Sequence, residues 1–316
     1  IMLKARTEGI VNVFPLGAIT KGEKGETLAQ IGEMYEAGCV GVSDDGMPVM
    51  NSKVMRHAME YVKAFDIPVI SHSEDLNLSG NGVMNEGDMS TLLGLTGIPA
   101  ASEDVMVSRD ITLAELTGTR LHICHVSTAG AVRLIRAAKE RGVKVTAEAA
   151  PHHFTLTDKA VAEYDTNAKM KPPLRSEADR EAVREGLRDG TIDVIATDHA
   201  PHSEDEKMVE FDLAPFGIVG LETALPLSLK LVEDGVLTLN EMIAKLTHLP
   251  SAVIKVSKGA LNPGDAADIL IFDPEKKIKI DREKFRSKSR NTPFSGWELR
   301  GAVLYTIVNG NIVYSD

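Results

Sequence analysis

Aspartate and histidine residues end five short apolar segments of this sequence. In chain order they are Asp44 and Asp45 in VGVSDDG, His72 in PVISHSED, His125 in LHICHVS, His152 and His153 in TAEAAPHH, and Asp198, His199 and His202 in DVIATDHAPH. Imidazole and carboxylate ligands suit a divalent metal such as Zn²⁺, and an incomplete protein shell leaves room for water. No thiol belongs to the set, which disfavours a structural zinc site. The pattern therefore indicates a catalytic metal centre.

Within this set the sequence leaves some choices between neighbours. If the LHICH segment is a strand, His125 and His122 lie on opposite faces, and only one face can point into a barrel. We predict that His125 binds the metal, together with His72, and that His122 faces the covering helices as a structural residue. Asp44 and Asp45 also point to opposite sides, and the alternative for both is a pair that makes turn hydrogen bonds.

Asp198 is the predicted general acid and base. It follows the apolar residues 194–196, and a carboxylate there is costly to bury unless it meets a metal or a proton partner. No GxSxG serine motif occurs, and neither cysteine has a catalytic setting. We therefore expect metal-activated water, and no covalent intermediate, to carry out the reaction.

The elements that position these residues alternate between short β-branched segments and longer amphipathic ones, a pattern typical of a parallel sheet with crossover helices. One helix is expected after the N-cap Asn51, and another over Ala129–Arg141 that ends at Gly142. The predicted strands are Ile10–Phe14, Val40–Ser43, Val69–His72, Leu121–His125, Lys144–Glu148 and Asp193–Thr197. In a parallel barrel their carboxyl ends, where the metal candidates lie, converge on one face.

The predicted fold class is α/β, a (β/α) TIM-type barrel with a small appended β unit. A closed barrel has eight strands, and the chain begins at Ile1 instead of Met, so we expect the first barrel strand or strands to be missing. A doubly wound open sheet is the alternative, but neither GxGxxG nor a Walker loop occurs.

A change of pattern near Lys255 marks the expected boundary between a barrel at residues 1–254 and a β unit at residues 255–316. Helical periodicity is weak beyond it. The Asn309-Gly310 pair between Thr306–Val308 and Ile312–Tyr314 predicts a β-hairpin. We expect this unit to be half of a composite β-sandwich.

Composition narrows the classes of function and of compartment. The net charge of −11 makes nucleic acid an unlikely partner, because an acidic surface repels phosphate backbones. No apolar segment approaches the length of about 18 residues that spans a membrane, and no signal peptide is evident. Cys39 and Cys124 lie in apolar segments and are predicted to be free thiols. These features predict a cytoplasmic enzyme.

Ordered short motifs along nearly the whole chain resemble one protein family. They are SDDG, ISHSED, NEG, HVS, PPLR, TDHAPH, FGIVGLET and SRNTPFSG, together with a GxxADIxIFD tail. Together they resemble the class I bacterial dihydroorotases of the amidohydrolase superfamily. The resemblance implies an enzyme with one or two Zn²⁺ ions that interconverts N-carbamoyl-L-aspartate and L-dihydroorotate in pyrimidine biosynthesis.

The resemblance also implies roles for individual residues. His72 and His125 match ligands of one zinc ion, and Asp198 matches a ligand of the other and the acid/base. Asp45 matches a carboxylate that stands where hydantoinase-type relatives carry a carboxylated lysine. Glu74 lies near enough in sequence to fix a histidine tautomer, as Asp75 or backbone carbonyls also could.

For the substrate, the resemblance implies contacts from His202, the Phe216-Gly217 loop and Lys171, where relatives often carry asparagine. The family's HxHxR motif, which supplies two metal-binding histidines and a substrate-binding arginine, does not occur, because none of the nine histidines forms an HxH pair. We expect that motif to lie in the missing N-terminal part.

Two alternatives remain open. The first is another cyclic amidohydrolase, a hydantoinase, allantoinase or dihydropyrimidinase, which would need a bridging lysine in place of Asp45. The second is a non-catalytic homologue that scaffolds aspartate transcarbamoylase and has lost metal ligands. A homodimer, and aspartate transcarbamoylase as a further partner, are expected from the resemblance.

Overall fold

A parallel sheet forms the centre of the computed structural model, which describes residues 1–316. Its strands, in spatial order, are β1 (Val69–Ser71), β4 (Leu121–Ile123), β5 (Val145–Ala149) and β6 (Val194–Ile195). Single parallel bridges continue the sheet beyond β1, from Val69 to Val42 and from Val42 to Gly17. Spatial order therefore follows chain order, as the barrel prediction requires.

Four of the six predicted strands are present, three of them in shorter form and the fourth, β5, shifted by one residue, and two predictions are wrong in detail. The Val40–Ser43 segment contributes only the bridge at Val42. Ile10–Phe14 forms no strand, because the chain pairs a few residues later, where the Pro15 carbonyl accepts a hydrogen bond from the Val40 amide. Proline and glycine at residues 15–17 are poor β-formers, so the pattern placed the strand on the apolar residues before them.

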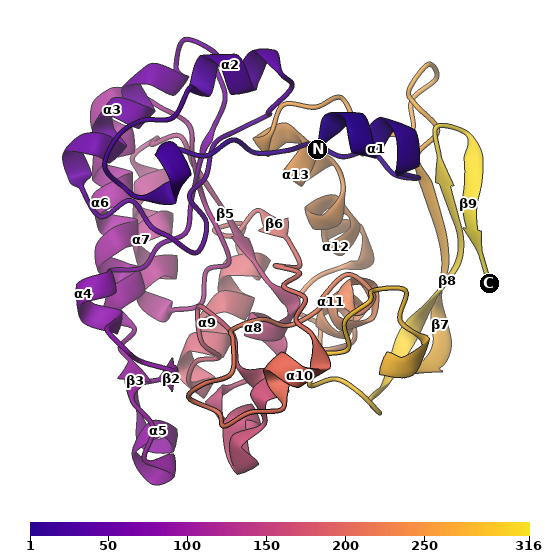
Figure 1. Cartoon of the computed structure of the whole chain (residues 1–316). Helices are drawn as coiled ribbons and strands as arrows, with labels where there is room; N and C mark the ends of the chain where they lie inside the picture. Colours follow the sequence, from indigo (N-terminus) through magenta and orange to yellow (C-terminus); the bar gives the residue numbers. More distant parts are fainter.

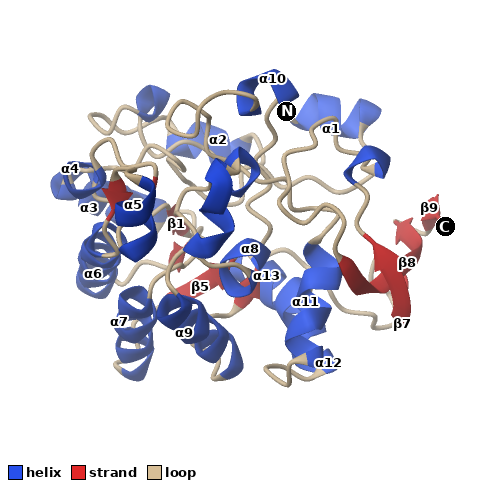
Figure 2. Cartoon of the chain, turned by 90° about the horizontal axis from the view of Figure 1, so that it is seen from below, coloured by secondary structure: helices blue, strands red, loops and turns tan.

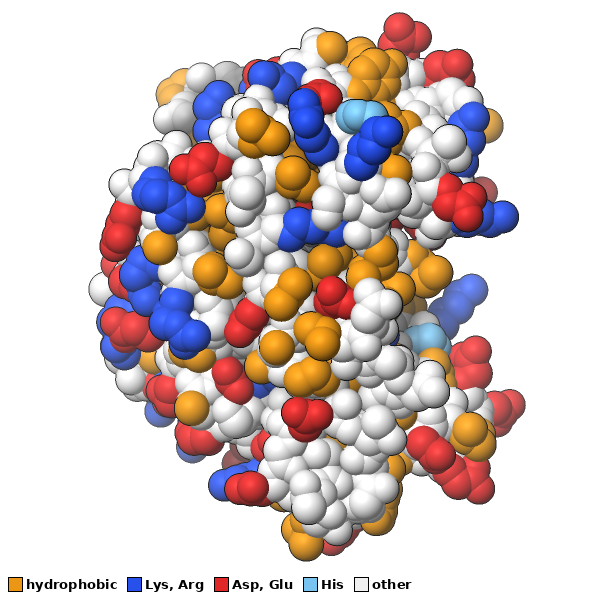
Figure 3. Space-filling model, turned by 90° about the vertical axis from the view of Figure 1, so that its left-hand side faces the viewer, with side chains coloured by type: hydrophobic (Ala, Val, Ile, Leu, Met, Phe, Trp, Pro, Cys, Tyr) orange, Lys and Arg blue, Asp and Glu red, His pale blue; other side chains and the backbone are white.

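Helices cover the outside of this sheet (Figures 1 and 2). They include α3 (Ser52–Val62), α6 (Ala101–Thr117), α7 (Ala129–Glu140) and α9 (Glu177–Arg188). The predicted start of α3 is confirmed, since Asn51 caps it by accepting from the Lys53 amide at 3.0 Å. The helix α7 starts at Ala129 as predicted and ends at Glu140, one residue before the predicted end. On the face shown in Figure 3, acidic and basic side chains are interspersed, with no large basic area.

The other elements are short or lie outside the central sheet. The remaining helices are α1 (Met2–Glu8), α2 (Ile31–Glu36), α4 (Leu76–Ser79), α5 (Asp88–Leu93), α8 (Pro151–Thr155), α10 (Glu204–Lys207), α11 (Ala224–Glu233), α12 (Leu239–Leu246) and α13 (His248–Val253). Four 3₁₀ turns are η1 (Lys21–Glu23), η2 (Asp158–Tyr164), η3 (Thr166–Ala168) and η4 (Arg282–Lys284). Strands β2 (Met84–Asn85) and β3 (Gly97–Ile98) pair with each other. None of the helices combines the length and apolarity needed to cross a membrane.

A separate antiparallel sheet contains β7 (Ile269–Lys279), β8 (Glu298–Val308) and β9 (Asn311–Ser315). It lies on the side of the molecule opposite α3 and α6 (Figure 1). The predicted hairpin is confirmed, because β8 and β9 pair across Asn309 and Gly310, whose φ angles of 49° and 80° suit a tight two-residue turn. The division between residues 254 and 255, and the half-sandwich, stay predictions.

Candidate active site

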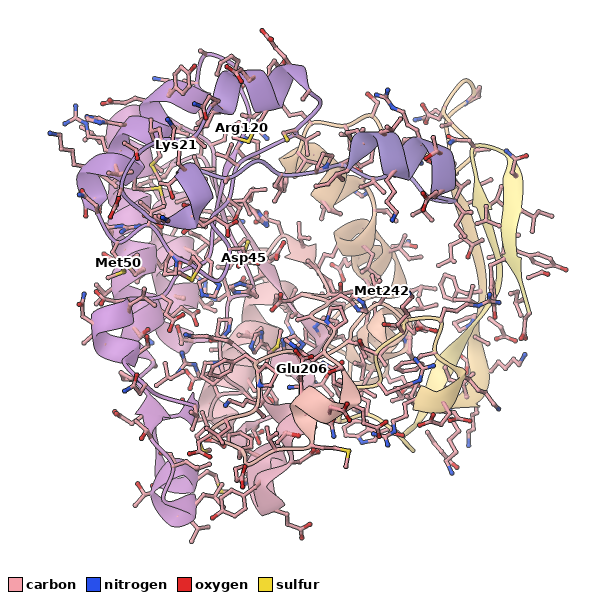
Figure 4. All side chains as sticks on the ribbon, in the orientation of Figure 1. Lys21, Asp45, Met50, Arg120, Glu206 and Met242 are labelled. Carbon is pink, nitrogen blue, oxygen red and sulfur yellow. The ribbon has the colours of Figure 1, made fainter.

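Three side chains from neighbouring strand ends form a compact group. Asp45 lies three residues beyond the bridge at Val42, His72 follows β1 and His125 lies just beyond β4. His72 Nδ1 is 3.0 Å from Asp45 Oδ1 and 3.0 Å from His125 Nε2, and the latter atom is 3.3 Å from Asp45 Oδ1. Figure 4 shows Asp45 near the middle of the molecule.

The geometry of this triangle fits one divalent ion. Ligand atoms bound to tetrahedral zinc at about 2.0–2.1 Å lie roughly 3.3 Å apart, close to the three separations between Asp45, His72 and His125. All three ligand atoms lie within 4.8 Å of one another. The donor set, two imidazoles and a carboxylate, leaves at least one coordination position for water or substrate.

The charges around His125 also favour a cation. Its side chain is only 4% exposed. Burial lowers its pKa, but the hydrogen bond to Asp45 and the charges of Asp198, Asp45 and Glu148 outweigh burial and raise it to about 10. Burial opposes ionisation of Asp45 as well, yet His125 and His72 hold its pKa well below the usual range. A metal ion would relieve the same excess of negative charge.

Asp198 borders this group without belonging to it. Its Oδ2 atom is buried and has no hydrogen-bond partner, and its φ of 46° turns the chain sharply as it leaves β6. Burial raises its pKa; the charge of His125 opposes the shift, and the charges of Asp45 and Glu148 add to it. A carboxyl with a raised pKa and a free oxygen is suited to accept and release a proton.

His122 does not face the helices, which corrects the prediction from strand alternation. Its ring nitrogens contact Thr146 Oγ1 and Glu148 Oε2, each at 2.9 Å, on the polar side of the sheet, where the charge of Glu148 also acts on His125. Alternation fails because β4 ends at Ile123 and His125 has a φ of 35°, so the chain turns His125 toward the same side. With both nitrogens engaged, His122 stays a structural residue.

The two adjacent aspartates have different surroundings. Asp44 is buried and accepts hydrogen bonds from the amides of Ile19 at 2.7 Å and Thr20 at 3.2 Å, so it fixes the preceding loop. The side chain of Asp45 is 53% exposed and points to the two histidines. The turn-bonding alternative therefore describes neither side chain, because Asp44 bonds to a segment far away in the sequence and Asp45 points to the histidines.

The four predicted substrate contacts lie together. His202 Nε2 is 2.8 Å from the Phe216 carbonyl, and the Lys171 ammonium lies 5.3 Å from the centre of the Phe216 ring. Gly217 packs so closely that a Cβ there would lie 2.6 Å from the Ala200 carbonyl oxygen and 2.7 Å from the His202 ring. A larger residue at 217 would displace His202, so glycine is a packing requirement here.

Glu74 connects these contacts to the metal group. One of its oxygens lies 2.9 Å from the Lys171 ammonium and the other lies 3.2 Å from His72 Nε2. Burial raises its pKa, but His72, Ser79 and Lys171 outweigh burial and lower it to about 2. An ionised Glu74 fixes the tautomer of His72 with its Nδ1 free for a metal. Asp75, the other candidate for this role, caps α4 instead.

Glu74→Gln is expected to weaken metal binding by roughly 10- to 100-fold, the usual effect of losing a group that orients a metal ligand. Glutamine keeps the size of the side chain but no longer carries the charge that holds the His72 tautomer. Competition with a chromophoric chelator measures the metal affinity. Glu86→Gln, the same change at an exposed position, is the control. Unchanged affinity in Glu74→Gln would show that His72 needs no such partner.

Sequence reasoning missed one support of the site. Glu103 of α6 is buried and accepts hydrogen bonds from the amides of Ser127 and Thr128, at 2.9 and 3.2 Å, directly after His125. Arg175 lies 3.8 Å from Glu103 and donates to Ser127 Oγ at 3.1 Å. The PPLR motif drew attention to Arg175, whereas Glu103 lies in a helix and carries no signal that local pattern could detect.

Comparison with other proteins assigns this chain to a family. The model of the amidohydrolase family matches residues 11–313. A dihydroorotase of Geobacter sp. (strain M21) is 59% identical over 314 residues, which cover 99% of this chain and 74% of that protein. A dihydroorotase of Pelotomaculum thermopropionicum is 61% identical over 310 residues, 98% of this chain and 73% of that protein. This chain belongs to the amidohydrolase family, among the dihydroorotases.

A solved structure supports the amidohydrolase fold. The L-hydantoinase (dihydropyrimidinase) from Arthrobacter aurescens superposes with a TM-score of 0.83 at 27% identity, covering 95% of this chain and 69% of that one. The predicted fold class, a TIM-type barrel of the amidohydrolase superfamily, is thereby confirmed. Metal dependence is general in this family, and the Asp45, His72 and His125 group could bind the ion.

Proposed function

We propose that this chain catalyses the reversible ring closure of N-carbamoyl-L-aspartate to L-dihydroorotate and water. The observation that carries the proposal is the similarity to dihydroorotases, at 59% and 61% identity over nearly the whole chain. The metal group supports it, because its third member is the carboxylate of Asp45 and not a lysine. Lys171, which borders the group, is paired with Glu74.

The proposed metal ion is Zn²⁺, held by Asp45, His72 and His125, with Asp198 beside them. When bound, zinc supplies an activated water at neutral pH and polarises the carbonyl under attack. The His-rich donor set without thiolate is the reason for choosing zinc over the alkaline-earth ions, which prefer all-oxygen sites. Metal analysis of the purified protein distinguishes one bound ion from two.

Asp198 is the proposed catalytic acid and base. In the hydrolytic direction it accepts the proton of the attacking water and delivers it to the ring nitrogen that leaves. His202 and the Phe216-Gly217 backbone border the position proposed for the substrate, and Lys171 lies over the Phe216 ring. These groups orient the substrate so that its carbonyl faces the metal group.

A substrate comparison tests this function. The zinc-loaded chain, with its metal content measured first, is given L-dihydroorotate, hydantoin, allantoin and dihydrouracil at equal concentration. We expect dihydroorotate to be hydrolysed at least about 100-fold faster than the others, the discrimination of a site whose polar groups match one substrate. Preference for another ring would reassign the chain to the hydantoinase group. Bound zinc without turnover of any ring would favour a non-catalytic homologue.

We further propose, from the family resemblance, that the protein acts in the cytoplasm, forms a homodimer and associates with aspartate transcarbamoylase. Sedimentation velocity of the protein alone and with that enzyme tests both associations. A monomer that stays separate from the transcarbamoylase would contradict them.

A further inference from the structure

The recognition loop, defined as residues 202–217, contains three of the four proposed substrate contacts: His202, Phe216 and Gly217. Both of its ends are tied by Asn291, whose side-chain amide donates to the Ala200 and Gly217 carbonyls at 2.9 Å each and accepts from the His202 amide at 3.2 Å. Between these ends the loop has only one short helix, α10, marked by Glu206 in Figure 4. Something other than regular structure must therefore hold its middle.

Lys169 contacts the middle of the recognition loop through its buried side chain. Its side chain is almost fully buried, and its ammonium donates to the carbonyls of Phe211 at 2.7 Å and Asp212 at 3.1 Å. The same ammonium lies 4.6 Å from the centre of the Phe216 ring. The backbone carbonyl of Lys169 also accepts from the Gly217 amide at 2.9 Å. One residue thus fixes both the carbonyls before Phe216 and the amide after it.

Lys207, at the end of α10, makes a second attachment. It is 5% exposed, and its ammonium donates to the Pro215 carbonyl at 2.7 Å and to the Thr166 carbonyl at 3.0 Å. The Thr166 hydroxyl donates in return to the Lys207 carbonyl at 2.6 Å. The loop is therefore bonded to itself and to η3 immediately before Phe216.

These two attachments are costly for the fold. Neither ammonium has a carboxylate partner within ion-pair distance, and the charge of each acts in the same buried region. Burial lowers the pKa of Lys169 and that of Lys207, each to about 8, and the charge of Lys169 adds to the effect on Lys207. Buried cations that bond only to carbonyls do little for stability compared with apolar residues of similar size. Their benefit is the fixed path of the backbone that they bind.

We propose that Lys169 and Lys207 are positioning residues that set substrate affinity by holding the recognition loop in the shape that presents His202, Phe216 and Gly217. The inference rests on the proposed function for the identity of the substrate. The part that concerns how firmly the loop is held does not depend on that function. Neither lysine touches the metal group, so the expected effect falls on binding and not on the chemical step.

Lysine-to-methionine variants test the proposal. Methionine matches the length of the lysine side chain, and at position 169 it can pack against Phe211 and Phe216, so the core is preserved. We expect Lys169→Met and Lys207→Met each to raise KM for dihydroorotate roughly tenfold or more and to change kcat less than about threefold, the pattern of lost uniform binding. Lys169→Arg should recover part of the affinity. Lys159→Met, at an exposed lysine, is the matched control.

Amide hydrogen exchange tests the same proposal without measuring activity. We expect the amides of Leu213, Ala214 and Gly217, which bond to backbone carbonyls, to exchange at least about tenfold faster in Lys169→Met. The variant loses the side-chain bonds to the Phe211 and Asp212 carbonyls that hold this segment, so the segment opens more often, while β4 and β5 stay protected. Unchanged exchange and KM in both variants, or a fall in kcat alone, would overturn the proposal. If Lys169→Met does not fold, Lys207→Met decides the question. Failure of the proposed function would appear separately, as absent turnover in the unmodified chain.

Discussion

Asp198→Asn is expected to lower kcat for dihydroorotate by at least about a thousandfold, while the thermal unfolding temperature changes little. General acid–base catalysis contributes typically 10²–10⁴-fold, and an amide cannot take the proton that the carboxylate takes. The change is nearly isosteric. Because Asp198 Oδ2 has no hydrogen-bond partner, replacing this oxygen breaks no hydrogen bond in the fold. Burial raises the pKa of Asp198, so the carboxylate that is lost holds a proton more readily than an exposed aspartate does.

Steady-state kinetics and circular dichroism on the same preparations measure this outcome. Asp88→Asn makes the same chemical change at an exposed position of α5 and should keep kcat within about twofold. Turnover within tenfold of the unmodified chain in Asp198→Asn would remove the acid/base role from this residue, and another group would have to carry the proton.

His72→Ala should lower the affinity for zinc by more than about 100-fold and abolish turnover with it. Loss of one of three clustered ligand atoms leaves the triangle open, and partners outside the ligand set already account for 10- to 100-fold in such sites. His72 Nδ1 lies 3.0 Å from both other ligand atoms, so its removal opens one corner of the proposed site. Mass spectrometry of metal content after dialysis measures the loss.

The matched control for this change is His57→Ala, on the solvent face of α3, where the histidine is exposed. It should bind zinc like the unmodified chain. Full zinc occupancy in His72→Ala would mean that the metal is held elsewhere, and His125 and Asp45 would then need a different explanation for their proximity.

Much of the fold could be predicted from the sequence pattern, because the residues that favour each strand or helix locally are also those that the packed fold buries. The segments that became β1, β4, β5 and β6 are short and mostly apolar, and the covering helices α3, α7 and α9 begin at Asn or Ser/Thr caps that the sequence shows. The pattern did not predict the segment around Gly17, which forms the outer edge of the central sheet. Pairing there occurs around Gly17, among residues with low β-propensity, and only contact with Val42 determines it.

The site was partly predictable for a similar reason. Residue type and position at strand ends were enough to select His72 and His125, which the structure groups with Asp45, the residue that the resemblance selected. The role of Asp198, selected in the same way, stays a prediction. Strand alternation was not enough for His122, because β4 ends before the residues in question. The partnership of Glu74 with Lys171 joins segments almost a hundred residues apart, and no local pattern contains such a pair.

The backbone at the ends of β4 and β6 has a consequence for how this protein can change. His125 and Asp198 have φ angles of 35° and 46°, a conformation that costs most residues on the order of 1 kcal/mol or more. Glycine at either position would remove that cost, in a domain whose net stability is typically about 5–15 kcal/mol. The same change would delete a side chain of the proposed site, and at position 125 a buried one that is hydrogen-bonded to Asp45 and His72. Relief of the backbone strain at either position is therefore accompanied by loss of the proposed function, and this strain is retained together with the chemistry.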